Sequence, residues 1–336
     1  MSRRKRAALI FAGIVALLLV TVAGIGVWAI RSGWLVAKIR AGIIEQAEKA
    51  TGGTVEMGAL RSDWRKLTVE TDRFVVHGTE PSGQAPLLAI DRLRVKLQIV
   101  SLIERDISID RIEADRPRVH LIVYPDGATN LPQPKTIRKP GESVAQTILD
   151  LKIAHFDLRD GVILEESPGQ PLRAMPASAQ GENLSAHVVY DLARARYSGD
   201  ISLQPLHLVW NGLAPVDVQI SASAAMERNR IVVSGATVTT AASGLNLKNA
   251  ILNNFSAPVL AARYDARVSL AEVAKIFKLG TKQTGTVNVA GEARFLSRAD
   301  YRVSGSAFGS GIAFDNLRNV AVSGSFDAGP EKYMGK

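Results

Sequence analysis

The stretch Arg92–Ile99, RLRVKLQI, decides the fold because apolar and polar side chains alternate along it. Successive side chains of a β-strand point to opposite faces of a sheet. The apolar positions are Leu93, Val95, Leu97 and Ile99. The stretch therefore predicts a strand with one apolar face and one polar face.

The same alternation returns along the rest of the chain. It is found in Arg118–Val123, Leu206–Trp210, Val216–Ile220 and Thr286–Val289. Glycines suited to tight turns occur between these stretches, at Asp126-Gly127, Asn211-Gly212, Ser243-Gly244 and Gly291. We therefore expect a mainly β fold, a long antiparallel meander in which helices are few and short.

The N-terminal region has the pattern of a membrane anchor. Residues 7–30 carry no charged side chain, and 24 helical residues reach about 36 Å, enough to cross a hydrocarbon core of ~30 Å. The basic run Arg3-Arg4-Lys5-Arg6 favours keeping residues 1–6 in the cytoplasm. We expect a single-pass protein with most of the chain across the membrane. A cleaved signal peptide ending at Val27-Trp28-Ala29 is the alternative.

Residues 31–53 follow the expected span and predict a juxtamembrane amphipathic helix. Leu35, Ile39, Ile43 and Ala47 are spaced four apart, which places them on one face of a helix over Trp34–Ala50 that ends at Gly52. The helix can lie on the membrane or pack against the end of a sheet.

The net charge of +9 first suggests a nucleic-acid partner, but the positions of the charges favour a membrane. Four basic residues lie in the cytoplasmic tail, and Arg31, Lys38 and Arg40 lie just beyond the span, where anionic lipid headgroups attract them. Other basic residues alternate with acidic ones, as in Arg105-Asp106. We therefore expect contact with anionic lipid and no nucleic-acid partner.

The residues that usually carry catalysis or bind metals are sparse. The chain has no cysteine and no G-x-S-x-G motif, and its histidines are widely separated, at His77, His120, His155, His187 and His207. We expect no catalytic residue, no metal site, no cofactor and no enzyme activity.

A series of short motifs between Ala50 and Pro132 resembles a known family. In order they are Thr51–Val55, Asp63-Trp64-Arg65-Lys66-Leu67, Ile107–Ile112, Arg116-Pro117 and Asp126–Leu131. Their order behind an N-terminal anchor resembles the N-terminal region of the AsmA-like family, and most closely its TamB type, the translocation and assembly module subunit. Phe156–Val162 and Gly285–Gly291 continue in the same manner.

This resemblance implies an inner-membrane anchor, a periplasmic sheet curled into a long apolar groove, and a part in lipid transport and outer-membrane biogenesis. The implied segments are an AsmA/TamB-like β unit over 54–131, a proline-rich loop over 132–141 and a continuing β-groove with short helices over 142–336. Members of the TamB type usually run longer and end in a characteristic C-terminal domain, so the resemblance implies a fragment or a short relative.

Two hypotheses about function follow. In the first, the groove shields an acyl-chain lipid, such as a phospholipid, on its way to the outer membrane. The expected lining is Leu93, Val95, Leu97, Ile99, Val119, Leu121 and Val123. In the second, the apolar faces close into a dry core, as in a sandwich of two sheets, and the protein is a scaffold that docks an outer-membrane assembly protein through a sheet edge.

Overall fold

The computed structural model describes residues 34–63, 65–101, 106–132, 146, 149–168, 176–255, 257–280, 283–297, 300–314, 316–330 and 332–335. The predicted cytoplasmic tail and membrane span, residues 1–30, lie outside this part of the chain, as do Trp64 and most of the proline-rich loop. Among the described residues, no helix combines the length and the apolar character needed to cross a membrane.

The described residues form one 17-stranded sheet and two named helices, α2 (Trp34–Thr51) and α4 (Leu270–Ile276). The first nine strands are β1 (Thr54–Met57), β2 (Leu60–Asp63), β3 (Thr68–Thr71), β4 (Phe74–His77), β5 (Leu88–Ser101), β6 (Asp106–Ile122), β7 (His155–Glu166), β8 (Ser178–Asp191) and β9 (Arg196–Val209). The others are β10 (Val216–Glu227), β11 (Arg230–Thr239), β12 (Gly244–Asn253), β13 (Val259–Ser269), β14 (Thr284–Ser297), β15 (Asp300–Phe314), β16 (Leu317–Gly329) and β17 (Lys332–Gly335).

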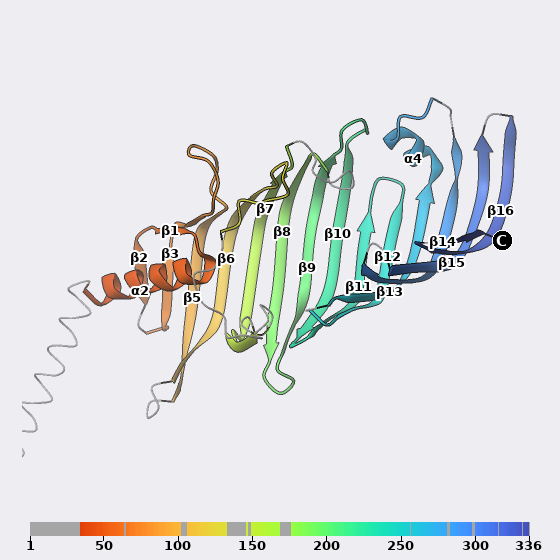
Figure 1. Cartoon of the computed structure of the whole chain (residues 1–336). Helices are drawn as coiled ribbons and strands as arrows, with labels where there is room; N and C mark the ends of the chain where they lie inside the picture. Colours follow the sequence, from red (N-terminus) through yellow and green to blue (C-terminus); the bar gives the residue numbers. More distant parts are fainter. Residues whose placement is uncertain are drawn as a thin grey trace, which may run out of the picture.

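From β5 to β17 each strand pairs with the next strand of the chain. At the other end of the sheet β5 pairs with both β3 and β4, which pair in turn with β2 and β1. Figure 1 shows β1–β5 and β16 at opposite ends of the molecule. The structure therefore confirms a mainly β fold with few helices, built on one long, mostly antiparallel sheet, and the described strands do not form a sandwich.

One pair of strands departs from the predicted antiparallel meander. β6 and β7 run parallel, with Ile112 opposite Phe156 and Ala114 opposite Leu158. A parallel pair needs a crossover of a dozen residues or more, whereas an antiparallel pair needs only a turn. The chain between Ile122 and His155 supplies that length and includes the predicted proline-rich loop.

The turn predictions are correct at Gly127 and Gly212, which take a positive φ, and wrong at Gly291. Gly127 has φ +83° and Gly212 has φ +85°, both in turns. Gly291 instead lies inside β14, opposite Gly305 of β15. A side chain at Gly291 would place its Cβ 2.0 Å from the carbonyl oxygen of Ser304, so glycine is required there by close packing and not by a turn.

Helix α2 matches the helix predicted over Trp34–Ala50, and it packs against one face of the sheet. Gly52, with φ +81°, donates its N–H to the carbonyl of Glu48, 2.8 Å away, and so caps the helix. Ile43, Ile44 and Ala47 pack against a buried cluster from β1, β4, β5 and β6. In Figure 1 the helix crosses the sheet at its N-terminal end.

Helix α4 begins after Ser269, whose Oγ accepts the N–H of Glu272 at 3.4 Å and so caps the helix. The N–H of Ser269 donates to Ser243 Oγ at 3.1 Å. The carboxylate of Glu272 accepts from Thr240 Oγ1 at 2.7 Å and from Ser243. The cap therefore ties α4 to the β11–β12 turn.

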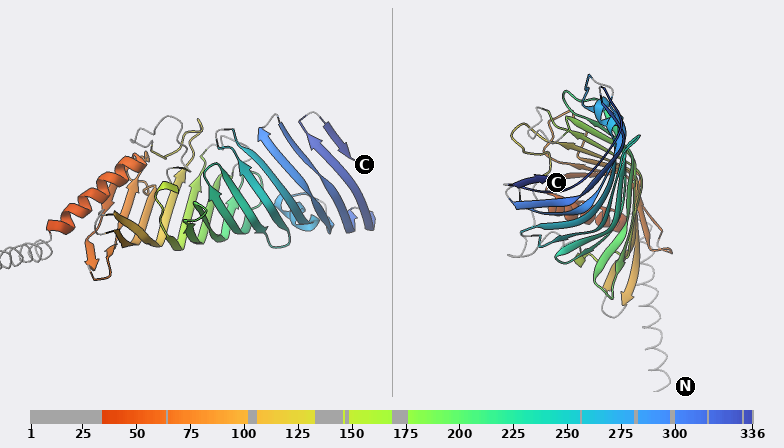
Figure 2. Two further views of the ribbon diagram at one scale, coloured as in Figure 1. Left: turned by 90° about the horizontal axis from the view of Figure 1, so that it is seen from below. Right: turned by 90° about the vertical axis from the view of Figure 1, so that its right-hand side faces the viewer.

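The sheet bends across its width as well as twisting along its length. The right-hand, end-on view in Figure 2 shows the strands curving to one side, and the left-hand view, from below, shows them stacked in a continuous row from α2 to β16. This curvature sets the shape of the two faces described below.

Candidate functional site

One face of the sheet carries an unbroken line of apolar residues and glycines across twelve strands, β5–β16. Each residue lies opposite the next in the strand ladder, so the line crosses from strand to strand without a polar side chain except the phenol of one tyrosine. We call it the apolar row: Leu93, Ala114, Leu158, Ala186, Ile201, Ala222, Ala236, Leu247, Tyr264, Gly291, Gly305 and Phe326. At about 4.8 Å per strand it is about 50 Å long.

A second line of large side chains runs beside the apolar row. It consists of Tyr190, Tyr197, Met226, Ile231, Leu252, Leu260, Phe295 and Tyr301. Side chains of both lines remain in contact with solvent, since Phe295 of the second line is 46% exposed and Ile201 of the apolar row is 48% exposed. We call the surface that carries both lines the apolar face.

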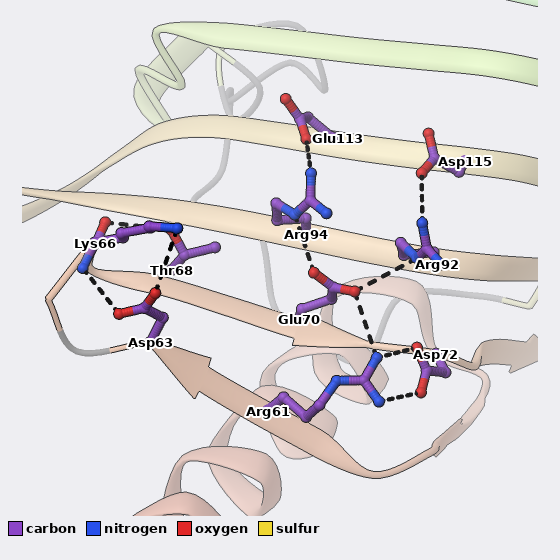
Figure 3. A network of polar contacts seen from close by, with 10 residues as sticks. All are labelled: Arg61, Asp63, Lys66, Thr68, Glu70, Asp72, Arg92, Arg94, Glu113 and Asp115. Carbon is purple, nitrogen blue, oxygen red and sulfur yellow. Dashed lines mark hydrogen bonds and ion pairs between the residues drawn. The ribbon is translucent and has the colours of Figure 1, made fainter.

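The opposite surface, which we call the polar face, carries charged and hydroxyl side chains. Arg94 donates to Glu113 at 2.8 Å and to Glu70 at 3.1 Å, and Figure 3 shows this network continuing through Arg92. Farther along, Arg263 pairs with Glu292 at 2.9 Å. Exposed ion pairs contribute little stability, about 0–1 kcal/mol each. These ion pairs matter here because they mark the side of each strand that faces water.

Asp157 of β7 is a buried charged group of the polar face, with an exposed side-chain fraction of 11%. Its carboxylate accepts from Arg111 at 2.7 Å and lies 2.6 Å from Nδ1 of His187. Burial favours the neutral acid, but the hydrogen bond of His187 and the charge of Arg111 outweigh it, so the pKa of Asp157 lies below its ordinary value. The group joins β6, β7 and β8 on the side away from the apolar row.

The apolar face is hollowed between β7 and β11. This pocket, which we call the apolar pocket, has a volume of about 390 Å³, and its lining includes Phe156, Gly199, Ile201, Met226 and Ile231. None of its lining residues is charged. Such a surface can remove hydrocarbon from water.

Of the predicted lining residues of β5, Leu93, Val95 and Leu97 lie at the N-terminal end of the apolar face. Leu93 belongs to the apolar row and packs against the cluster beneath α2. Val95 lies opposite Ile112 of β6, and Leu97 lies opposite Ile109. Ile99 lies opposite Ile107. Helix α2 therefore covers the start of this predicted lining.

The predicted lining residues of β6 reach the same face through an irregularity. Val119 lies opposite Leu88, and Leu88 packs against the same cluster as Leu93, although strict alternation would place Leu88 and Leu93 on opposite faces. Arg116, a non-glycine residue with φ +50°, marks the irregularity on β6. Leu121 follows two residues after Val119 on the same strand.

Val123 lies beyond the end of β6 and bridges to Thr129. It is only 7% exposed, and the bridge ties it to the loop that follows. The fully buried Asn130 holds this loop, donating to the carbonyl of His120 at 2.8 Å and accepting the N–H of Ile122 at 3.0 Å. Val123 is therefore a core residue of this loop and not part of an open surface.

The structure describes two of the three residues that were predicted to contact lipid headgroups. Arg31 lies outside the described residues. Lys38 lies on the exposed side of α2. Arg40 donates through Nε to the carbonyl of Gly58 at 3.2 Å and through its terminal nitrogen to the carbonyl of Met57. Arg40 thus fastens α2 to the end of β1, a role that the sequence did not predict.

Sequence reasoning missed most of the apolar row. Its members on β8–β15 are largely alanine and glycine, such as Ala186, Ala222, Ala236 and Gly305, which give only a weak alternation signal. The available signal was that no position of the apolar row carries a charged residue, but the strand register is needed to see it.

Comparison of the chain with protein-family models finds no match, and comparison with curated proteins finds no related sequence. The functional argument therefore depends on the geometry of the sheet and on the sequence pattern.

Proposed function

We propose that the apolar face binds the acyl chains of lipids, and that the protein is an inner-membrane-anchored, periplasmic member of the AsmA-like family, of the TamB type, which shields lipid on its way to the outer membrane. The observation that carries this proposal is the apolar row, which crosses twelve strands in register.

A surface of this kind needs a cover. Contiguous apolar patches on soluble monomers are usually limited to a few hundred Å², and a sheet with one apolar face normally buries that face against another layer. Of the described elements, α2 covers the face only near β1–β6, and α4 is a seven-residue helix between β13 and β14. Lipid hydrocarbon is a suitable cover because each buried methylene contributes about 0.8 kcal/mol.

The chemistry of the face favours hydrocarbon over a polar ligand. The two lines of side chains offer no charged group, and their hydroxyls belong to tyrosines such as Tyr197 and Tyr264. A line without charged groups lets an acyl chain shift along it with little change in contacts. The uncharged segment 7–30 and the basic residues beside it support attachment at a membrane, where such chains are available.

The scaffold hypothesis has one observation in its favour. β17 pairs only with Phe326–Gly329 of β16, and no other described strand pairs with the remaining outer edge of β16. Leu317 and Val322 on this strand are 60% and 55% exposed. An exposed edge of this kind can accept a strand from a partner protein.

The proposal is tested by photocrosslinking in cells at two adjacent residues of β11. Ile231 lies on the apolar face, opposite Met226, and Val232 lies on the polar face, opposite Ala225. Both are aliphatic, β-branched and half-buried, so they form a matched pair. A photoreactive side chain at 231 should capture lipid and one at 232 should not. Equal capture, or capture of protein alone at 231, contradicts lipid binding by this face.

A further inference from the structure

We propose that one acyl chain has a preferred binding site on the apolar face, the apolar pocket between β7 and β11. This inference rests on the proposed function and adds the place on the sheet where an acyl chain binds most tightly. A uniform face would instead hold a chain equally well at any strand.

Gly199 forms the floor of the pocket. It lies opposite Val188 of β8 and Ala224 of β10, so no side chain rises from the centre of the pocket and only small ones stand beside it. A Cβ at this position would lie 2.1 Å from the carbonyl oxygen of His187 and 2.8 Å from the Cα of Val188. The backbone of β8 therefore leaves no room for a side chain at position 199, and the centre of the pocket stays open.

Tyr197 forms a fixed wall at one end. Its phenol oxygen accepts the backbone N–H of Ile153 at 2.8 Å, and its ring centroid lies 4.8 Å from that of Tyr190. The residue is 7% exposed, and burial raises the pKa of its phenol. A wall that is already ordered loses little conformational entropy when a ligand binds.

The glycines farther along the apolar row do not produce a comparable hollow. Tyr264 lies opposite Gly291. A Cβ added at Gly291 would lie 2.8 Å from the phenol oxygen of Tyr264, and a Cβ added at Gly305 would lie 3.0 Å from it. The tyrosine side chain thus occupies the space that these glycines leave. At Gly199 the corresponding space is open, and it is bordered by Ile201, Met226 and Ile231.

The experiment compares lipid capture along the apolar face of the full chain in cells. A photoreactive side chain is introduced singly at Ile201 in the pocket, and at Phe295 or Val322 beyond it. These three residues are 48%, 46% and 55% exposed, so their access to solvent is similar. We expect about tenfold more lipid adduct at 201 than at 295 or 322, the ratio that burial of two further methylene groups gives.

A blocking variant supplies a second measurement. Ala224→Phe fills the pocket and should reduce lipid capture by a photoreactive side chain at Ile231 to the level seen at Val322. Ala307→Phe places the same ring on the apolar face of β15, opposite Val289, and should leave capture at 231 unchanged. Thermal unfolding monitors both variants, and Met226→Trp, near the end of β10, replaces Ala224→Phe if that variant does not fold.

The outcomes separate this inference from the proposed function. Strong capture at 201 that Ala224→Phe removes supports the preferred site. Equal capture at 201, 295 and 322, unaffected by Ala224→Phe, overturns the preferred site and leaves lipid binding by the face intact. Absence of lipid adducts at all three positions overturns the proposed function itself.

Discussion

Tyr264 lies opposite Gly291 in the β13–β14 ladder, and its phenol donates a hydrogen bond to the carbonyl oxygen of Ser304, 3.2 Å away. Glycine inside a strand usually weakens it, because it offers no side chain to pack and loses more entropy on folding. Here the aromatic side chain covers the backbone of two neighbouring strands. The pair keeps the apolar row continuous where it would otherwise be bare backbone.

This packing predicts a large difference between two glycine-to-alanine substitutions. Gly291→Ala should lower the free energy of unfolding by about 1–3 kcal/mol, the usual cost of overpacking, because its Cβ would meet Ser304 and Tyr264. Gly235→Ala in β11 should be nearly neutral, since a Cβ there meets nothing within 4 Å. Urea unfolding measures both. Equal changes in the free energy of unfolding would show that the close packing at Gly291 does not add to the cost of the substitution.

The buried carboxylate of the polar face predicts a pH-dependent stability. Because the folded state lowers the pKa of Asp157, its contribution is fully present above the unfolded value of about 3.9 and is lost as pH falls through the folded pKa. Asp157→Asn should therefore destabilise the protein by about 1–3 kcal/mol at neutral pH. The difference from wild type should shrink in acid.

The control for this prediction is a similar pair in a more open place. Asp217 lies 2.7 Å from Nδ1 of His207, but its side chain is 72% exposed. Asp217→Asn should change the free energy of unfolding by no more than about 0.5 kcal/mol at any pH. An Asp157→Asn effect that stays constant from neutral pH to acid would mean that its charge is not the source of the stability.

The sequence predicted individual strands well because alternation is a local property. Arg92–Ile99 lies within β5, and Thr286–Val289 lies within β14. The parallel pairing of β6 and β7 was not predictable, because nothing in a strand's own pattern states which neighbour it joins.

The membership of the apolar face was harder still to predict. A non-glycine residue with positive φ interrupts β6 at Arg116, β7 at Asp160 and β8 at Asn183. Counting by twos along a strand fails across such a position. The sequence therefore predicted that Leu93 and Val119 share one face, but it could not show that the face continues through small residues to Phe326.

The placement of Arg40 allows its charge to be separated from its hydrogen bonds. Arg40→Lys keeps the positive charge but cannot reproduce the two-pronged contact with the carbonyls of Met57 and Gly58. It should lower the free energy of unfolding by about 1 kcal/mol, nearly as much as Arg40→Ala. A free energy of unfolding for Arg40→Lys equal to that of the wild type would show that charge alone matters at this position.

The cap of α4 predicts a local loss of stability. Ser269→Ala removes the acceptor of the Glu272 N–H and should cost about 1 kcal/mol. Ser325→Ala on β16, an exposed serine, should cost much less. Hydrogen exchange should show faster opening of α4 and of the β11–β12 turn, which Glu272 joins to it. Unchanged exchange in both segments would argue against this link.

The most direct test of lipid binding by the apolar face uses the absence of cysteine from the chain, which makes single-cysteine labelling clean. A fluorophore is attached to the full protein at Ile201→Cys on the apolar face or at Asp200→Cys, its neighbour on the polar face, and each protein is reconstituted with phosphatidylcholine carrying brominated acyl chains. We expect strong quenching at 201 and little at 200, relative to the same lipid without bromine. Equal quenching at both residues, or none at 201, would contradict the account.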